Sequence, residues 1–282
     1  MHPSRKTPSP VTVCGSLSLH PVTLGRAMHQ AAYDALGLPW VYAPFACDGG
    51  SLADALRGMR ALGIRGLGVS MPFKVEILPL LDDLAPLARD IGAVNTVVNG
   101  ADGRLVGHNT DAEGSVAALA EVVETLEGRE VLLLGAGGAA RAVAFGLHRA
   151  GARLVLANRT EERARALAAE LPGARSVPFA EACREPICPI FVQASSGGMH
   201  GMGDPPLEGG AFRPESVVMD IIYDPLETTL LRTARASGAT VIHGGRMLLH
   251  QAARQFELYV GRPAPLEVMS AALERARRAN AP

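Results

Sequence analysis

The sequence has few aromatic residues, few cysteines, almost no net charge and no long hydrophobic run. Aromatic residues make up 4% of its 282 residues, so we expect an aliphatic core. Its 27 lysines and arginines nearly balance 28 aspartates and glutamates, which leaves a net charge of −1 and no overall field to attract nucleic acid or an anionic membrane. No apolar run reaches the roughly 18 residues that a membrane-spanning helix needs, since glycines and Arg141 interrupt residues 131–147.

The four cysteines, Cys14, Cys47, Cys183 and Cys188, are too few for a disulfide framework, and their spacing does not suit zinc. We therefore expect reduced thiols, no metal site and a cytoplasmic protein. Residues 1–10 are polar and proline-rich, which is typical of a frayed tail and not of a signal peptide.

What the chain does have is a regular alternation of strand and helix patterns. Hydrophobic residues make up 48% of it, and at about 150 residues per domain its length predicts two domains or one large one. Strands are expected at residues 11–14, 41–47, 64–69, 94–98, 104–106, 131–134, 154–157, 190–193, 217–221 and 241–242. Helices are expected at residues 27–36, 51–62 with Ser51 as the cap, after Pro72, at 111–126, 138–149, 161–171 and 226–236, and twice more at the end of the chain. The segments 94–98 and 104–106 are typical of a hairpin, and the alternation elsewhere predicts parallel sheets with helices on both faces.

A glycine-rich turn follows the buried strand 131–134 and opens a helix, as in dinucleotide-binding βαβ units. Gly135 allows the tight turn, Gly137 lets a pyrophosphate approach the helix N-terminus, and Ala140 takes the close-packing third position. The alternative is a glycine turn in an α/β protein that binds nothing.

The next strand ends without the acidic residue that usually holds the ribose of NAD. Instead Asn158, Arg159 and Thr160 follow it, with Arg163 one helical turn further on. A guanidinium and a hydroxyl suit a 2′-phosphate, so the sequence favours NADP over NAD. The alternative is that Arg159 is a solvated surface residue and that Thr160 only caps the helix.

Lys74 lies just past a buried strand, and Asp111 lies at a helix start. Alcohol oxidation needs a group that takes the hydroxyl proton while hydride leaves carbon, and a partly buried lysine oriented by a carboxylate can do this. Either residue alone would be an ordinary solvated charge.

Seven motifs occur in a characteristic order. They are Met71-Pro72-Phe73-Lys74, Gly92-Ala93-Val94-Asn95-Thr96, Asn109-Thr110-Asp111, Gly135-Ala136-Gly137-Gly138-Ala139, Asn158-Arg159-Thr160, Tyr223-Asp224-Pro225-Leu226-Glu227-Thr228 and Met247-Leu248-Leu249-His250-Gln251. Together they resemble the shikimate dehydrogenase family, over about residues 11–256.

The resemblance implies a two-domain α/β enzyme that reversibly reduces 3-dehydroshikimate to shikimate with NADPH, in an active site between its domains. The expected domains are a discontinuous substrate domain, residues 1–110 and 247–282, and an NADP-binding Rossmann domain, residues 111–246. By similarity Lys74 is the catalytic acid and base and Asp111 is its partner. The implied substrate-binding residues are Ser16, Ser18, Thr23, Ser70, Asn95, Tyr223 and Gln251. The implied cofactor-binding residues are Gly135, Ala136, Gly137, Gly138, Ala139, Asn158, Arg159, Thr160, Arg163, Ser195, Gly244 and Met247.

Several of these residues also have a purely structural interpretation. Tyr223 could be a half-buried core residue, Met247 plain packing and Gln251 a helix-surface amide. Asn95 lies within a strand pattern, so a purely structural role would have to supply its side chain with a partner.

The chain departs from the family pattern in its substrate contacts. Pro21 and Thr23 stand where serines are expected, so Ser16, Ser18 and Thr23 are the hydroxyl groups that remain. Gly68 replaces an asparagine that would reach a ring hydroxyl. These departures resemble the shikimate dehydrogenase-like branch and predict slower turnover of shikimate, with a related alicyclic hydroxy acid as a better substrate.

Competing functions are a dehydrogenase of quinate or another polyol acid, a non-catalytic NADP(H)-binding sensor and a Rossmann enzyme acting on a folate-like carrier. A sensor would not need Lys74 and Asp111, and the folate hypothesis does not account for Asn109-Thr110-Asp111 with Gln251. The expected assembly is a monomer or a homodimer.

Overall fold

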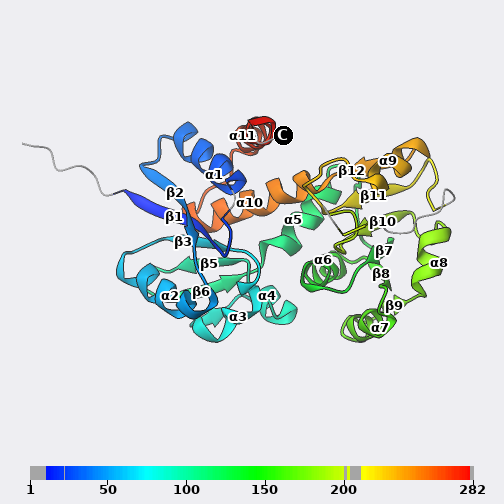
Figure 1. Ribbon diagram of the computed structural model, residues 1–282, viewed down its shortest axis with the longest axis horizontal. Coiled ribbons are helices and arrows are strands. Elements are labelled where there is room, and N and C mark those ends of the chain that lie inside the picture. Colours follow the sequence, from blue (N-terminus) through cyan, green and yellow to red (C-terminus); the bar gives the residue numbers. More distant parts are fainter. Residues whose placement is uncertain (1–10, 22, 200–201, 204–210, 280–282) are drawn as a thin grey trace, which may run out of the picture. The chain divides into compact units, whose positions relative to one another are not determined.

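The computed structural model describes residues 11–21, 23–199, 202–203 and 211–279, and the chain forms two compact units (Figure 1). One unit combines the described parts of Met1–His108 and Ala252–Pro282, and the other spans Asn109–Gln251. The tail expected over residues 1–10 lies outside the described residues. The first division follows His108, close to the expected boundary after residue 110. The second follows residue 251 instead of residue 246, because helix α10 (Gly244–Val260) continues unbroken past the expected boundary.

The first unit contains a six-stranded mixed sheet. Its strands are β1 (Thr12–Ser18), β2 (Trp40–Ala46), β3 (Gly66–Val69), β4 (Asp83–Leu84), β5 (Thr96–Asn99) and β6 (Leu105–His108), in the order β2-β1-β3-β5-β6-β4. The hairpin is confirmed, because β5 and β6 pair antiparallel. Outside the hairpin, the expected parallel pairing holds for β1 with β2 and with β3, but β3 pairs antiparallel with β5.

Helices cover this sheet on both faces. They are α1 (Leu24–Ala35), α2 (Leu52–Ala61), α3 (Phe73–Glu76), α4 (Pro86–Ile91), α11 (Leu266–Ala279) and the last part of α10, with short 3-10 turns at Gly49–Ser51 and Leu78–Leu80. Helices α1 and α11, from opposite ends of the sequence, lie side by side (Figure 1). Leu56 and Met59 of α2 pack on the face that carries Leu17, Leu67 and the other apolar residues of the core.

On the opposite face, α10 approaches β3 very closely. A Cβ atom at Gly66 would lie 2.2 Å from the ring of Tyr259, which is 1% exposed. Only a glycine leaves room for this ring, so the contact fixes the helix on the sheet.

The second unit contains a six-stranded parallel sheet. Its strands are β7 (Glu130–Leu134), β8 (Arg153–Ala157), β9 (Arg175–Ser176), β10 (Ile190–Gln193), β11 (Val217–Asp220) and β12 (Thr240–Ile242), in the order β12-β11-β10-β7-β8-β9. Counted within the unit, this is the 3-2-1-4-5-6 order of dinucleotide-binding folds. The predicted Rossmann fold is confirmed.

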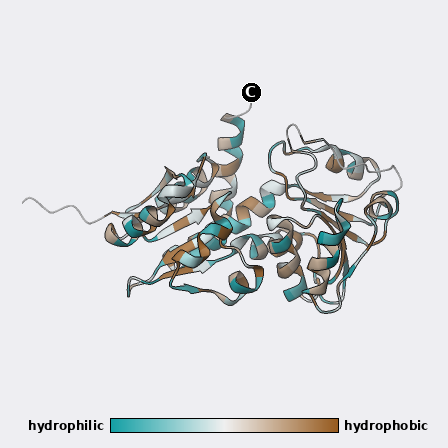
Figure 2. Ribbon diagram, turned by 60° about the horizontal axis from the view of Figure 1, so that its bottom comes forward, coloured by the Kyte–Doolittle hydropathy of each residue, from teal (hydrophilic) through white to brown (hydrophobic). Residues whose placement is uncertain are grey.

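Strand β7 explains why helices cover both faces of this sheet. Val131 and Leu133 enter one hydrophobic core, and Leu132 and Leu134 enter the other. The covering helices are α5 (Thr110–Leu119), α6 (Gly138–Arg149), α7 (Glu161–Ala169), α8 (Phe179–Arg184), α9 (Thr229–Ala236) and the start of α10. Figure 2 shows hydrophobic segments along the strands and hydrophilic segments on the helices.

One expected helix boundary is wrong, and one expected cap differs in its hydrogen bond. The helix expected over 111–126 ends at Leu119, because Val122, Val123 and Thr125 are β-branched and disfavour a helix. Ser51 is the N-cap residue of α2, as expected, but its side chain makes no capping hydrogen bond. Asp48 caps the preceding 3-10 turn by accepting from the Ser51 backbone N–H at 2.8 Å. The short elements β4, α4, β9 and α8 were not anticipated.

In the part of the chain that the structure describes, no helix is both long and apolar enough to span a bilayer. All four cysteines are buried free thiols. Burial raises the pKa of Cys14 to about 12 and that of Cys188 to about 11, so both stay protonated at neutral pH.

We expect Gly66→Ala to destabilise the protein by about 1–3 kcal/mol, because its methyl group would overlap the Tyr259 ring. Gly58→Ala is the control. Gly58 lies inside α2 with nothing within 4 Å of a Cβ atom, so this change should stabilise the helix by roughly 0.5–1 kcal/mol. Urea unfolding measures the free energy of unfolding of both variants. Equal changes of the same sign would contradict the close contact between residue 66 and the Tyr259 ring.

Candidate functional site

In the first unit, predicted substrate residues gather at the carboxyl edge of the sheet. Ser18 ends β1, and Ser70 follows β3, which pairs parallel with β1. The Ser70 backbone N–H donates to the Leu17 carbonyl at 3.1 Å. Asn95 precedes the antiparallel strand β5, so it lies at this same edge, and its carbonyl accepts from the Val69 N–H at 2.6 Å.

Lys74 lies on α3, directly beyond this edge. The buried Phe73 anchors the short helix, while Lys74 is half-buried. Its backbone carbonyl accepts from the Val94 N–H at 2.8 Å, which ties α3 to the segment that carries Asn95.

Lysine is rare in this chain, a signal that the sequence analysis missed. Only Lys6 and Lys74 occur, and all other basic side chains apart from histidine are arginines. Arginine does not release its proton in proteins, whereas lysine can. Lys74 is therefore the one amine side chain within the described residues.

The Asn95 side chain is 2% exposed and belongs to a hydrogen-bonded series. The Thr96 hydroxyl donates to Asn95 Oδ1 at 2.8 Å, and Gln255 Nε2 donates to Thr96 Oγ1 at 3.0 Å and to the Asn95 carbonyl at 3.4 Å. Gln255 Oε1 lies 3.4 Å from His29 Nε2. Asn95 thus has the side-chain partner that a buried amide needs.

The remaining hydroxyl groups of the first unit differ in exposure. Ser16 is half-buried and lies near the Tyr42 hydroxyl, Ser18 is 6% exposed, and Thr23 is exposed at the start of α1. His108 was not predicted. It ends β6 opposite Thr96, and burial and the nearby charge of Arg254 lower its pKa.

In the second unit, the glycine loop leads from β7 into α6. Gly135 has φ +126°, and a Cβ atom there would lie 2.9 Å from the backbone of Ala194 and Ser195. Gly137, Gly138 and Ala139 are exposed, and a Cβ atom on either glycine would meet nothing within 4 Å. The N-terminus of α6 therefore faces open space, as an anion-binding turn requires.

The loop after β8 lies beside this turn, because the Gly135 N–H donates to the Ala157 carbonyl at 2.8 Å. Arg159 and Thr160 are exposed, and Asn158 Nδ2 donates to the Thr160 carbonyl at 3.0 Å. Thr160 precedes α7 but makes no capping hydrogen bond with its side chain. Arg163, in the first turn of α7, is also exposed.

Buried polar residues shape the neighbouring loops, and the sequence analysis missed them. Gln193 ends β10; its Oε1 accepts from the Ser195 N–H at 3.1 Å, and its Nε2 donates to the Gly197 carbonyl at 2.7 Å. Asp220 ends β11 and accepts from the Thr228 hydroxyl at 2.7 Å, which closes the loop that carries Tyr223. Tyr223 itself is 38% exposed.

Asp111 lies half-buried in the first turn of α5. The side chain of Asn109 caps this helix by accepting from the Asp111 and Ala112 N–H groups at 3.2 and 3.3 Å. Gln251 is close by, since its Oε1 accepts from the Thr110 hydroxyl at 3.4 Å. Lys74 belongs to the first unit and Asp111 to the second, so their pairing stays a prediction.

Two predicted cofactor residues lie at the start of α10. A Cβ atom at Gly244 would lie 2.2 Å from the Ile221 carbonyl, so only glycine fits beside β11. Met247 is 7% exposed and packs in the core.

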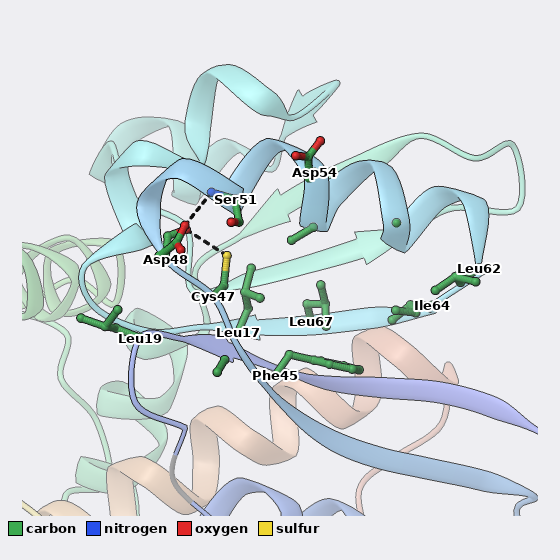
Figure 3. A pocket seen from close by; sticks show the side chains of 13 residues that line it. Leu17, Leu19, Phe45, Cys47, Asp48, Ser51, Asp54, Leu62, Ile64 and Leu67 are labelled. Atoms are coloured by element: carbon green, nitrogen blue, oxygen red, sulfur yellow. Dashed lines mark hydrogen bonds between the residues drawn. The ribbon is translucent and has the colours of Figure 1, made fainter.

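A separate apolar groove of about 600 Å³ lies between the first sheet and α2 (Figure 3). Cys47, Asp48 and Ser51 are at one end of it, and Leu62 and Ile64 are at the other. It contains none of the predicted site residues. Across the described residues, no three His, Cys, Asp or Glu side chains cluster as a metal site would require.

Three family models match this chain. They describe a shikimate dehydrogenase substrate binding domain (residues 21–97), a shikimate / quinate 5-dehydrogenase (117–184) and a shikimate 5'-dehydrogenase C-terminal domain (244–274). A shikimate dehydrogenase (NADP(+)) of Moorella thermoacetica is 44% identical over 274 residues, 93% of this chain and 92% of the relative. The chain belongs to the shikimate dehydrogenase family. The predicted family is therefore confirmed.

Solved structures that are similar to this chain have the same fold. The shikimate 5-dehydrogenase of Thermus thermophilus, in complex with NADP(H) and shikimate, is 39% identical with a TM-score of 0.85, covering 94% of this chain and 99% of that one. The ligand-free 5-ketofructose reductase of Gluconobacter sp. strain CHM43 is 36% identical with a TM-score of 0.87 and the same coverage. Proteins with this fold are thus named for at least two different substrates.

The burial of His29 makes the stability of the folded chain sensitive to acid. Its side chain is fully buried, which lowers its pKa to about 4 from 6.5. The unfolded chain therefore binds more protons than the folded chain between these values, so stability is complete above pH 6.5 and falls towards pH 4.

We expect His29→Gln to remove this loss. Between pH 6.5 and 4 the free energy of unfolding of the unchanged protein should fall more steeply than that of the variant, by at most about 1.4 kcal/mol per pH unit. Urea unfolding at half-unit pH intervals gives the free energy of unfolding of both proteins as a function of pH. Parallel curves would contradict the assignment of the acid sensitivity to His29.

Proposed function

We propose that this chain is an NADP-dependent oxidoreductase that interconverts shikimate and 3-dehydroshikimate by hydride transfer. The observation that carries the proposal is Lys74, a half-buried amine beside the edge where Ser70 and Asn95 meet. The relatives named shikimate dehydrogenase (NADP(+)) support the same activity at up to 44% identity over most of the chain.

The second unit has the features that NADP requires. The exposed N-terminus of α6 suits the pyrophosphate, and Arg159 and Arg163 suit the 2′-phosphate, with Thr160 as a further donor. Bound NADP+ supplies the hydride acceptor for alcohol oxidation. We assign cofactor binding to the residues predicted above: Gly135, Ala136, Gly137, Gly138, Ala139, Asn158, Arg159, Thr160, Arg163, Ser195, Gly244 and Met247.

Proton transfer is assigned to Lys74. When a hydride leaves the alcohol carbon, the hydroxyl proton must leave its oxygen, and the Lys74 amine accepts it; in the reverse reaction the ammonium group returns it. Asp111 is the carboxylate partner that orients this amine.

Substrate binding is assigned to polar side chains of both units. Ser16, Ser18 and Thr23 are the hydroxyl groups available for a carboxylate, with Tyr223 as a further contact. Ser70, Asn95 and Gln251 are the groups for ring oxygens. Among the three N-terminal hydroxyls, Ser16 and Ser18 lie within β1, whose end is at the Ser70 edge.

A second candidate function is oxidation or reduction of a related polyol, such as quinate or a keto sugar. Gly68 favours it, because a glycine offers no side chain to a ring hydroxyl, and a 5-ketofructose reductase has the same fold at 36% identity. Initial rates with shikimate, quinate and 5-ketofructose, each with NADP(H) and NAD(H), decide between them. NADPH binding without turnover of any of them would favour a sensor.

The free buried thiols support a reducing compartment, so we place the protein in the cytoplasm. A monomer or a homodimer is proposed for its assembly, and sedimentation velocity distinguishes the two. An aromatic amino acid biosynthetic role follows from shikimate as substrate.

Replacing Lys74 tests the proton-transfer role. We expect Lys74→Ala to lower kcat by about 10²–10⁴-fold with a smaller change in KM, because general acid–base groups act in the transition state. Lys74→Arg keeps the charge but cannot exchange a proton, so it should be nearly as slow. Lys6→Arg is the control for the loss of a lysine. A Lys74→Arg enzyme with full activity would reduce Lys74 to an electrostatic contact.

Replacing Arg159 tests the cofactor preference. Charge-assisted hydrogen bonds contribute about 1.5–3 kcal/mol, so Arg159→Ala should raise KM for NADP+ by about 10–100-fold and leave KM for NAD+ nearly unchanged. Arg165→Ala is the matched control, since Arg165 is an exposed arginine of α7 that pairs with Glu162 at 2.9 Å. Equal effects on the two cofactors would refute a 2′-phosphate contact.

A further inference from the structure

Four buried or nearly buried side chains of the first unit form one hydrogen-bonded series that leads to Asn95. They are His29, Gln255, Thr96 and Asn95, which are 0%, 5%, 0% and 2% exposed. The series joins helices α1 and α10 to the edge of β5. The proposed function uses Asn95 and leaves the other three without a role.

The chemistry of the partners fixes the direction of each bond. The Asn95 carbonyl can only accept, so the Gln255 group that faces it is the Nε2 donor, and Oε1 faces His29. His29 Nε2 must then carry the proton. The Thr96 hydroxyl accepts from Gln255 and donates its hydrogen to Asn95 Oδ1.

The same reasoning fixes the Asn95 amide. Asn95 Oδ1 accepts from Thr96, so the other polar group of this amide is Nδ2, which only donates. Rotating the amide by 180° would place Nδ2 against Thr96, and the Thr96 hydroxyl would lose Oδ1 as the acceptor for its hydrogen.

Burial keeps the far end of the series in one protonation state. The pKa of His29 is lowered to about 4, so the ring is neutral near pH 7. Its Nδ1 is buried and has no hydrogen-bond partner among the described residues, as expected when the single proton lies on Nε2. The ring stacks on Tyr42 with centroids 4.3 Å apart, which holds it in place.

Gly68 allows Gln255 to reach this position. A Cβ atom at residue 68 would lie 3.3 Å from Gln255 Nε2 and 3.2 Å from the Tyr42 hydroxyl. Gly68 pairs with Ser16 on one side and with Thr96 on the other, so the Gln255 amide lies against the row of the sheet that contains these two residues. A larger side chain at residue 68 would press on Gln255.

We infer that Thr96 and Gln255, anchored by His29, are positioning residues that fix Asn95 as a hydrogen-bond donor and so select a substrate with an acceptor oxygen at that point. The inference rests on the proposed function for the identity of the substrate, but the hydrogen-bond directions do not depend on it. Lys74 takes no part in this series, so the effect falls on substrate binding more than on proton transfer.

The test compares two substitutions of Thr96 in oxidation of shikimate with NADP+. Thr96→Val keeps the shape but removes the hydroxyl, so the amide loses its fixed orientation; we expect KM for shikimate to rise about tenfold, with kcat and KM for NADP+ nearly unchanged. Thr96→Ser keeps the hydroxyl and should restore KM to within about twofold. Equal KM values for Thr96→Val and the unchanged enzyme would overturn the inference, as would a Thr96→Ser enzyme no better than Thr96→Val.

Asn99→Ala is the matched structural control. Asn99 is a buried amide at the other end of β5, where its Nδ2 donates to the Ile64 carbonyl at 3.2 Å. This variant should lose stability without a change in KM. A tenfold rise of KM in Asn99→Ala would show that any damage to β5 has the same effect, and would overturn the role of Thr96.

A second measurement is independent of activity. Nitrogen-15 NMR of the full chain, with His29→Gln to assign the signal, should show His29 as the Nε2–H tautomer at pH 7. The Nδ1–H tautomer would reverse the series and overturn the inference. If the unchanged enzyme does not turn over shikimate, the proposed substrate fails, while the tautomer still decides whether the series has the inferred direction.

Discussion

The antiparallel direction of β5 is the constraint on which the candidate substrate site depends. Strands β1 and β3 are parallel, so their carboxyl ends meet at one edge, and only a strand of opposite direction brings its first residues to that edge. Asn95 is therefore held by two neighbours at once: its carbonyl accepts from Val69, and its N–H donates to the His108 carbonyl at 3.1 Å. A parallel β5 would place Asn95 at the opposite edge, away from Ser70.

Arginine and lysine occupy different kinds of position in this chain. Ion pairs on the surface use arginine, such as Arg60 with Asp82 at 2.8 Å and Arg165 with Glu162 at 2.9 Å. These pairs need a fixed charge and multiple donors, which arginine supplies. Proton transfer needs a group that can lose its charge, and Lys74 is in the position where such a group is useful. A chain with almost no lysine that keeps one beside Ser70 and Asn95 is consistent with selection for that chemistry.

Much of the fold was predictable because its signals are local. The apolar run 131–134, the glycine turn after it and the helix from Gly138 follow one another in sequence, so the Rossmann unit could be identified before any contact was known. The hairpin was predictable for the same reason. The antiparallel pairing of β3 with β5 was not anticipated, since the direction of β5 relative to β3 depends on the path between them, where the short elements α3, β4 and α4 carry no strong periodicity.

The candidate site likewise combines residues that lie in local motifs with residues that no local motif marks. Lys74, Asn95 and Arg159 lie in compact motifs, whereas His29 and Gln255 are 226 positions apart and have no local pattern that marks them. Their role follows only from the packing of α1 on β1 and β2 and of α10 on β3. Asp220 and Gln193 were missed for a related reason: a single polar residue at the end of an apolar strand indicates a function only when its partners in the next loop are known.

The scarcity of aromatic residues makes the cluster around His29 more informative. Tyr33, Tyr42 and Tyr259 surround this ring with centroids 4.3 to 6.1 Å away, so three of the four tyrosines in the chain are next to one buried histidine. A buried polar network is costly when it is only partly satisfied, so its geometry is strongly determined by the fold. Because that geometry ends at Asn95 and not at Lys74, we expect substitutions in the network to change the substrate contact proposed for Asn95 and to leave Lys74, the proposed proton-transfer group, in place. Substrate preference and proton transfer can then vary separately. This fits the observation that proteins with this fold are named for different substrates.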